Sequence, residues 1–176
     1  MAVGVTVISY RMTNIVPVQT DKDIRVVANL AQIIWTEHYT PIIGLGQINY
    51  MLDKFQSKPA IQEQVKKGIQ YFLLQFHGEF AGYFSFEPHE DFLFLSKLYV
   101  LKSARGNGMA KAALSFIESQ AKKKGIPKIR LTVNKYNSKS ILAYEKMGFI
   151  NMGSIVQDIG NGFVMDDYVL EKDIIS

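Results

Sequence analysis

The chain has 176 residues and no cysteine; 48% of its residues are hydrophobic and 20% are charged. This composition predicts a single globular domain over residues 1–176, and it excludes disulfides, cysteine metal sites and an acyl-cysteine intermediate. The formal charge of +4 suits an anionic cofactor, but it is too small to indicate a nucleic-acid partner by itself.

Targeting signals are not evident. Residues 1–12 lack a basic segment followed by a long apolar core, so we expect no signal peptide. No apolar run approaches the roughly eighteen residues that span a bilayer. We therefore expect no membrane partner and a cytosolic location.

The beginning of the chain predicts a strand and then a helix. Residues 5–12 alternate enough to form a strand, which we expect at the edge of a sheet. Thr20 can cap a helix over residues 21–37, whose apolar residues fall on one face. We expect His38-Tyr39-Thr40-Pro41 to break that helix.

Two shorter helices and a hairpin come next. Helical spacing of apolar residues predicts helices over 45–56 and 59–67. Residues 70–77 and 79–87 are expected strands, and only Gly78 separates them, which indicates a tight hairpin. The remaining expected elements are a strand over 91–101, a helix that begins at Met109 and is stopped by Gly125-Ile126-Pro127, a strand over 128–133, a helix over 138–147, and a final hairpin of strands 149–159 and 163–171.

This order predicts an α/β fold: a mixed, mostly antiparallel central sheet of about seven strands, flanked by helices on both faces. A helix joins strands 91–101 and 128–133, so those two strands should run parallel.

The loop between strand 91–101 and the next helix has the residues of an anion site. Gly106 and Gly108 flank Asn107, so the backbone there can take positive φ and nothing large covers its N–H groups. The first N–H groups of the helix lack partners within it, the helix dipole adds partial positive charge, and Arg105 adds a full charge. We expect a phosphate or pyrophosphate ligand.

Comparison with known phosphate-binding loops narrows the kind of loop that this can be. A Walker A loop would need Gly-Lys-Ser/Thr, and a dinucleotide fingerprint would need a third small residue at position 111, which is Lys111. The segment from Arg105 to Ala110 instead fits R-x-x-G-x-A. After a strand that ends Leu98-Tyr99-Val100, this spacing resembles the coenzyme A loop of the GCN5-related N-acetyltransferases, the GNAT family.

A second motif of that family follows. Residues 134–149 read NKYNSKSILAYEKMGF and hold, in the expected order, Asn137, Ala143, Tyr144, Lys146, Gly148 and Phe149. The resemblance is clear over residues 81–172. It implies the GNAT acyl-CoA N-acyltransferase fold, with acetyl-CoA as cosubstrate.

The resemblance also implies the cofactor contacts. In the family the strand ending Leu98-Tyr99-Val100 diverges from its parallel neighbour, here 129–133, and its free backbone groups hold the pantetheine arm and face the thioester oxygen. The other implied cofactor-binding residues are Arg105, Gly106, Asn107, Gly108, Met109, Ala110, Lys111, Asn137 and Tyr144. The alternatives are a normal sheet edge, a solvated Lys111, and an Asn137 that caps a helix.

Tyr144 is the candidate catalytic residue. It lies two turns into the expected helix 138–147, which the resemblance places beside the divergent strands. A phenol can protonate the leaving coenzyme A thiolate, and its ordinary pKa near 10 keeps it protonated. The alternative is an aromatic residue that only packs.

A general base is harder to assign. Some relatives place a glutamate on the strand before the loop, but no carboxylate lies between Asp91 and the loop here. Either water carries the proton away or another residue accepts it, and the candidates are Glu37, His38, Tyr39 and Glu87. Asp166 and Asp167 are adjacent on the last strand and face opposite sides; they could attract a cationic amine or cover an edge strand with charge.

The leading hypothesis is an acetyl-CoA-dependent N-acetyltransferase in which a primary amine attacks the thioester directly in a ternary complex. Residues 35–55 resemble those of bacterial polyamine acetyltransferases, so the leading acceptor is a small amine or polyamine, and a protein or peptide N-terminus is the other. The alternatives are a non-catalytic coenzyme A-binding or regulatory domain and a nucleic-acid binder that uses Lys122-Lys123-Lys124. We expect no metal and no nucleic-acid partner, and leave a homodimer open.

Overall fold

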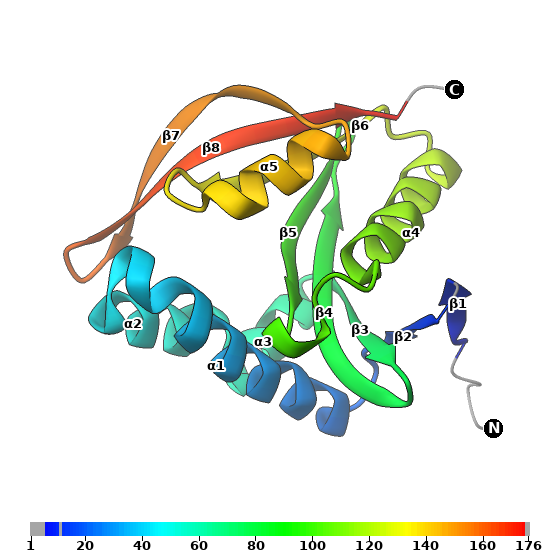
Figure 1. Cartoon of the computed structure of the whole chain (residues 1–176), viewed down its shortest axis with the longest axis horizontal. Coiled ribbons are helices and arrows are strands. Elements are labelled where there is room, and N and C mark those ends of the chain that lie inside the picture. The colour runs from blue at the N-terminus through cyan, green and yellow to red at the C-terminus, as the bar shows by residue number, and fades with distance from the viewer. Residues whose placement is uncertain (1–5, 11, 175–176) are drawn as a thin grey trace. The chain divides into compact units, whose positions relative to one another are not determined.

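A computed structural model of the chain describes residues 6–10 and 12–174 (Figure 1). Its contacts group the chain into two compact parts. The first part comprises Met1–Glu87 and Lys97–Phe116, and the second part comprises Pro88–Ser96 and Ile117–Ser176. Strand β5 (Leu93–Val100) and helix α4 (Met109–Lys123) each have residues in both parts. The single domain over residues 1–176 stays a prediction.

The first part holds an antiparallel run of strands and three helices. The β1–β2, β2–β3 and β3–β4 pairs are all antiparallel. The elements are β1 (Ile8–Tyr10), β2 (Thr13–Pro17), α1 (Asp21–Ile43), α2 (Leu45–Phe55), α3 (Lys58–Lys66), β3 (Gln70–Phe76), most of β4 (Glu79–Pro88), and the short 3₁₀ helix η1 (Lys102–Ala104).

The second part holds the parallel pairing that is described for this chain. There β6 runs parallel to β5 and antiparallel to β8, which pairs in turn with β7. The β5–β6 pairing joins Leu93 to Ile129 and Phe94 to Arg130, although β5 continues to Val100 and β6 to Asn134. The elements are β6 (Lys128–Asn134), α5 (Ser138–Lys146), β7 (Ile150–Gly160) and β8 (Phe163–Asp173).

Over the described residues the sheet has eight strands in the order β1-β2-β3-β4-β5-β6-β8-β7. The predicted mixed, mostly antiparallel sheet flanked by helices is confirmed, as is the parallel pair. The expected strand over 5–12 corresponds to β1 at the sheet edge; Val5 and Arg11 lie outside the described residues. The strand beyond the expected number is β2, a five-residue segment that ends at Pro17 and is too short to show a clear alternation.

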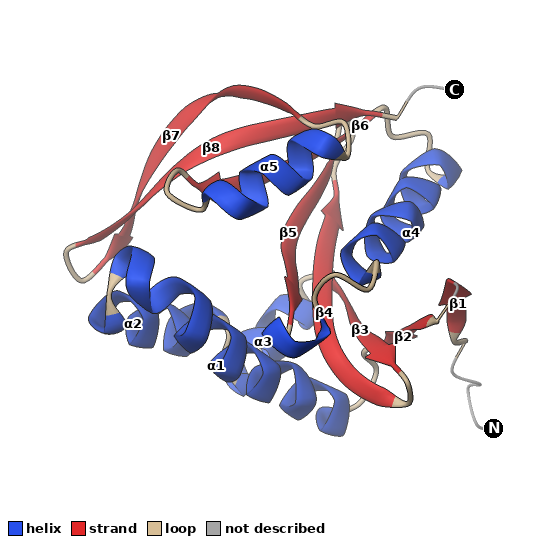
Figure 2. Cartoon of the chain, in the orientation of Figure 1, coloured by secondary structure: helices blue, strands red, loops and turns tan. Residues whose placement is uncertain are grey.

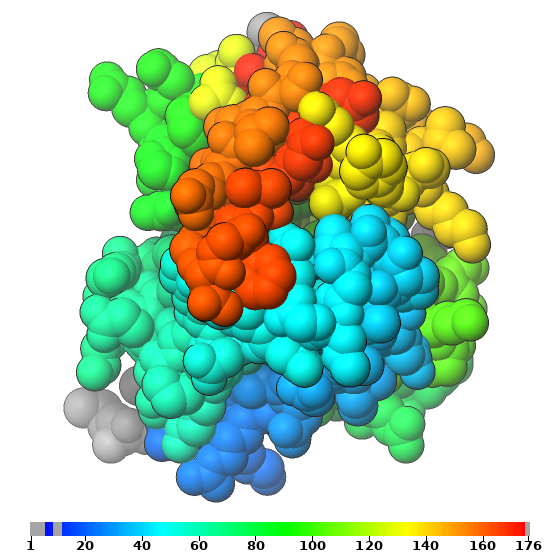
Figure 3. All heavy atoms as spheres, turned by 90° about the vertical axis from the view of Figure 1, so that its left-hand side faces the viewer, coloured from blue at the N-terminus to red at the C-terminus, as the bar shows by residue number. Residues whose placement is uncertain are grey.

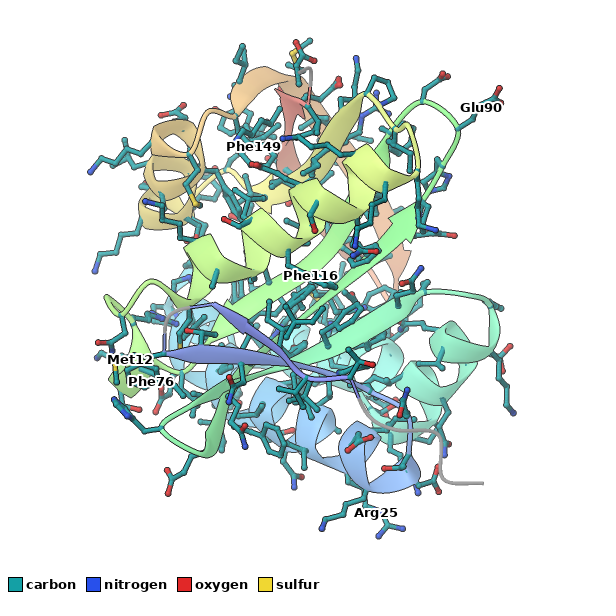
Figure 4. The ribbon with its side chains drawn as sticks, turned by 90° about the vertical axis from the view of Figure 1, so that its right-hand side faces the viewer. Met12, Arg25, Phe76, Glu90, Phe116 and Phe149 are labelled. Carbon is teal, nitrogen blue, oxygen red and sulfur yellow. The ribbon has the colours of Figure 1, made fainter. Side chains whose placement is uncertain are left out.

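In the first part, helices cover both faces of the strands (Figure 2). Phe72 and Phe84 stack on one face with ring centroids 5.0 Å apart. Phe116 of α4 meets Phe72 edge-on at 5.0 Å and points toward the strands (Figure 4). Because side chains alternate along a strand, Tyr83 points to the opposite face, which α1 covers. These aromatic rings all belong to the buried apolar core.

Helix α1 begins as predicted and ends later than predicted. The Thr20 side chain accepts from the Asp23 N–H at 3.2 Å, as an N-cap residue does. The predicted break at residues 38–41 is wrong, because α1 continues through Pro41 to Ile43. Proline costs one helical hydrogen bond there, but only the last turn follows it. The helix ends where the Gly44 N–H donates to a carbonyl in that turn, with φ at 82°.

The other expected elements lie close to their predicted bounds. The hairpin after β3 turns at His77 and Gly78, whose φ angles are 50° and 80°. Positive φ at both central residues matches the twist of a two-residue hairpin. In the described part of the chain, no helix is long and apolar enough to cross a membrane. The cytosolic location stays a prediction.

Gly82 of β4 allows the backbone of β5 to approach closely. A Cβ built on Gly82 would lie 2.5 Å from the Tyr99 carbonyl oxygen and 3.3 Å from the Val100 Cα. Both are backbone atoms, so no side-chain rotation relieves the contact. The Leu101 N–H donates to the Ala81 carbonyl at 2.8 Å and fixes the two strands at this spacing.

We predict that Gly82→Ala lowers the free energy of unfolding by about 2 kcal/mol, because the methyl group must push β5 away from β4. Gly78→Ala is the control: its Cβ meets no atom within 4 Å, although its φ of 80° is strained for alanine. Urea unfolding measures both. If the Gly82→Ala protein is as stable as the Gly78→Ala protein, the close approach of β4 and β5 does not contribute to stability.

Candidate active site

The loop before α4 adopts the conformation that its glycines permit. Gly106 has a φ of 81° and Gly108 a φ of 78°, as predicted. A Cβ at either position would meet no atom within 4 Å, so these glycines serve the backbone conformation rather than packing. Between them, the Asn107 Nδ2 donates to the Ala104 carbonyl at 3.0 Å and holds the turn.

The start of α4 leaves several amide groups without an acceptor inside the helix. The first helical bond runs from the Ala112 N–H to the Gly108 carbonyl at 2.9 Å. The amides of Met109, Ala110 and Lys111 precede that bond. The first turn contains no acidic residue, and residues 105–108 are exposed. This end of the helix can therefore hold an anion.

Arg105 is held at the end of β5 rather than free in solvent. Its Nε donates to the Val100 carbonyl at 3.1 Å. That bond leaves the two Nη groups for a phosphate, which an arginine can grip through paired donors. Leu98, Tyr99 and Val100 form the end of the same strand, so the first part brings together the predicted loop and the predicted pantetheine strand.

The β5–β6 register agrees with the divergence that the family resemblance implies. Pairing covers Leu93 and Phe94 and does not reach Leu98, Tyr99 or Val100. Two parallel strands that paired along their full length would leave no free backbone groups for a pantetheine arm.

An aromatic cluster lies beside Tyr99 in the first part. The Tyr99 ring centroid is 5.3 Å from that of Trp35, 6.2 Å from that of Tyr39 and 5.5 Å from that of Tyr83. Trp35 and Tyr39 come from α1, one turn apart, because the helix continues past the predicted break. Ring faces of this kind can attract a cationic ligand.

The four base candidates occupy different settings. Glu37 is exposed on α1, and His38 meets the Tyr39 ring edge-on at 4.8 Å. Glu87 is half-buried near the end of β4. The choice of base among Glu37, His38, Tyr39 and Glu87 stays a prediction.

Lys97 is a residue that sequence reasoning missed. Its side chain is only 7% exposed, and its Nζ donates to the Tyr71 hydroxyl and the Gln64 Oε1, both at 2.7 Å. Burial lowers the pKa of Lys97 from 10.5 to about 8. The sequence signal is a single charged residue in the largely apolar strand FLFLSKLYVL. The partners of Lys97 come from α3 and β3, far away in the chain.

Asn137 and Tyr144 lie in the second part. Asn137 is the N-cap residue of α5 and only 3% exposed, and its carbonyl accepts from the Ile141 N–H at 3.1 Å. Its side chain makes no capping bond to α5, so the side-chain cap that the sequence allowed does not form. Tyr144 is half-buried, and its ring meets Phe149 edge-on at 5.4 Å. Their contacts with a cofactor stay predictions.

Asp166 and Asp167 do not cover a sheet edge, because β8 lies between β6 and β7. Asp166 pairs with Lys135, whose Nζ lies 2.7 Å from its Oδ1. Asp167 is 6% exposed, and burial together with the Asp166 charge raises its pKa from 3.8 to about 6. Attraction of an amine by either carboxylate stays a prediction.

No group of three or more His, Cys, Asp or Glu side chains that could hold a metal ion occurs among residues 6–10 and 12–174.

We predict that Asp167 destabilises the fold at neutral pH. Its folded pKa lies above its ordinary value, so the folded state binds more protons, and stability falls as the pH rises from 3.8 to about 6. Asp167→Asn should remove this dependence and raise the free energy of unfolding at pH 7 by on the order of 2 kcal/mol. Urea unfolding at pH 4 to 7 tests this; parallel pH curves for the two proteins would contradict it.

The comparisons with known proteins agree with this geometry. The family model described as the acetyltransferase (GNAT) family matches residues 29–149. No curated protein matches the chain by sequence.

Solved structures share the fold. PaiA N-acetyltransferase from Thermoplasma acidophilum, in complex with coenzyme A, is 22% identical over 90% of this chain and 98% of its own, with a TM-score of 0.74. A GCN5-related N-acetyltransferase from Rhodopseudomonas palustris is 14% identical over 94% and 98%, with a TM-score of 0.78. The ribosomal-protein-S18-alanine N-acetyltransferase from Escherichia coli is 17% identical over 94% and 96%, with a TM-score of 0.70.

At these identities the solved structures establish the fold, and the family model, which spans more than half of the chain, establishes the family. The chain belongs to the acetyltransferase (GNAT) family and is an acyltransferase.

Proposed function

We propose that the protein transfers the acetyl group of acetyl-CoA to a primary amine by direct attack in a ternary complex. The observation that carries this proposal is the start of α4, where three amides without helical acceptors adjoin Arg105. A pyrophosphate is the anion that best matches several amides and a guanidinium at one site. The absence of cysteine from the sequence fits transfer without an acyl-cysteine intermediate.

The cofactor contacts follow from this assignment. The amides of Met109, Ala110 and Lys111, together with Arg105, Gly106, Asn107 and Gly108, would bind the pyrophosphate. The backbone of Leu98, Tyr99 and Val100 would pair with the pantetheine arm and place an N–H at the thioester oxygen. Asn137 would hydrogen-bond the cofactor. Similar structures were solved with coenzyme A and with acetyl-CoA bound, which supports the choice of cosubstrate.

Tyr144 would act as the general acid. When the amine nitrogen bonds to the acetyl carbon, the C–S bond breaks and a thiolate leaves. A neutral phenol can give that thiolate a proton and regain one from the nitrogen that becomes the amide.

A small amine or polyamine is the leading acceptor. The aromatic cluster of Trp35, Tyr39 and Tyr99 supports it, because ring faces attract ammonium groups. The ribosomal-protein-S18-alanine N-acetyltransferase has the same fold, so the fold alone does not exclude a protein acceptor.

An amine-panel assay tests the function. The protein is incubated with acetyl-CoA and with spermidine, simple alkylamines, amino acids or short peptides; thiol release is followed, and products are weighed by mass spectrometry. A product 42 Da heavier than its acceptor supports the proposal. Tight acetyl-CoA binding with no thiol release on any acceptor would instead favour a non-catalytic coenzyme A-binding domain.

A homodimer stays a prediction. Strand β7 is the sheet edge in the second part, and it lies on the surface (orange in Figure 3). Its exposed side chains include Ile150, Met152 and Val156, and its sequence has no lysine, arginine or proline to discourage pairing with another strand.

We predict that Arg105→Ala weakens coenzyme A binding about tenfold, because it removes charge-assisted hydrogen bonds to the pyrophosphate. Gly108→Val should weaken binding further by disturbing the positive φ of 78°. Lys123→Ala, at the other end of α4, is the control for loss of one positive charge. Calorimetric titration measures all three, and equal affinities for the Arg105 and Lys123 variants would argue against the pyrophosphate site.

We predict that Tyr144→Phe lowers kcat about 100-fold with little change in acetyl-CoA affinity, because only the acidic proton is lost. Tyr136→Phe is the matched control, since Tyr136 is 71% exposed in the same part of the chain. Steady-state kinetics on the acceptor that the panel identifies provides the measurement. Wild-type turnover in the Tyr144→Phe enzyme would refute the acid role.

A further inference from the structure

Lys97 is a buried amine with two fixed partners in the first part. Its Nζ donates to the Gln64 Oε1 and to the Tyr71 hydroxyl, both at 2.7 Å, and lies 5.0 Å from the centre of the Tyr71 ring. The Tyr71 hydroxyl donates to the same Gln64 Oε1 at 2.5 Å. Gln64 is oriented in turn, because its Nε2 donates to the Phe55 carbonyl at 2.9 Å. The amine is therefore held rigidly.

No charge compensates Lys97 within the described chain. The groups that face it are neutral: Gln64 from α3, Tyr71 from β3 and, beyond Tyr71, Tyr83 from β4. Burial raises the pKa of both tyrosines well above 10, so neither supplies a negative charge at physiological pH. Burial lowers the pKa of Lys97 to about 8.

The hydrogen bonds of Lys97 suit the neutral amine. An ammonium has three N–H groups, and an uncharged amine has two N–H groups and a lone pair. The two described hydrogen bonds of Nζ use two N–H groups. A third proton would need a further acceptor, whereas a lone pair can receive a proton from outside the cluster.

The position of Lys97 on β5 connects it with the acyl group. Lys97 and Tyr99 are two residues apart, so they share one face of the strand, with Cα atoms about 7 Å apart. Tyr99 belongs to the segment that would hold the pantetheine arm, and its ring lies in the aromatic cluster with Trp35 and Tyr39. Where a base and a bound amine do not touch, a bridging water can relay the proton between them.

We propose that Lys97 is the proton acceptor for the amine substrate, a role that rests on the proposed N-acetyltransferase function. The acceptor ammonium gives one proton, directly or through one water, to the neutral Nζ, and a neutral amine and a Lys97 ammonium result. The amine lone pair then bonds to the acetyl carbon as the C–S bond breaks. The second amine proton goes to the thiolate through Tyr144, and Lys97 returns its proton to solvent.

The test compares pH profiles of kcat/KM from pH 6 to 9.5 with the acceptor that the panel identifies. Lys97→Met keeps the length of the side chain and removes the amine; Lys97→Arg keeps a donor that stays protonated. Gln64→Leu keeps the lysine but removes an oxygen that stabilises its charged form. Lys22→Met, an exposed lysine at the start of α1, is the control. Thermal unfolding and acetyl-CoA affinity are measured for each variant.

The wild-type profile should rise with pH and bend near 8, where Lys97 loses its proton. In Lys97→Met and Lys97→Arg the bend should disappear, and kcat/KM at pH 8.5 should fall about 100-fold. In Gln64→Leu the bend should move to lower pH while the plateau rate is kept. The Lys22→Met profile should match the wild type.

Other outcomes overturn the proposal. A uniform loss of rate in Lys97→Met with the bend unchanged would mean that Lys97 is only structural. If the Lys97 variants do not fold, an unmoved bend in Gln64→Leu would likewise exclude Lys97 as the proton acceptor. If the wild-type enzyme is active and the pH profile of Lys97→Met equals that of the wild type, only the role of Lys97 is excluded. If the wild-type protein releases no thiol with any acceptor, the proposed function is excluded as well.

Discussion

Unpaired backbone amides are the feature on which this structure's chemistry depends. An α-helix leaves its first amides without acceptors, and they need a partner from outside the helix. At the start of α4 the exposed glycines at 106 and 108 place no side chain over the loop, and the first helical turn contains no acidic residue. The site therefore suits a ligand with negative charge and several acceptor oxygens, which is what a pyrophosphate offers.

The packing of the first part positions this site. Gly82 lets β4 approach the end of β5 closely, and the Leu101 N–H bonds back to β4. The loop then starts from a fixed point, to which Arg105 is also bonded through the Val100 carbonyl. The aromatic cluster packs against β5 on one sheet face, where the Tyr83 and Tyr99 ring centroids lie 5.5 Å apart. A rigid strand end is needed if an acyl group is to be aimed at an amine.

Local features of the site could be predicted from sequence. The positive φ angles at Gly106 and Gly108, the start of α4 and the family itself follow from residues close together in the chain. Features that depend on contacts between residues far apart in the chain could not be predicted from the sequence. Gly82 matters because of the Tyr99 carbonyl, and Lys97 matters because of Gln64 and Tyr71. The break predicted at Pro41 is wrong for a different reason: a proline in the last turn of a helix costs too little free energy to end the helix.

An amide chemical-shift titration tests the central claim most directly. In ¹⁵N-labelled protein, acetyl-CoA should shift the amide signals of Gly106 and of Gly108 to Lys111, whereas S-acetylpantetheine, which lacks the pyrophosphate, should leave these signals unchanged. The same shifts with both ligands, or no shift at these amides with acetyl-CoA, would contradict the pyrophosphate site.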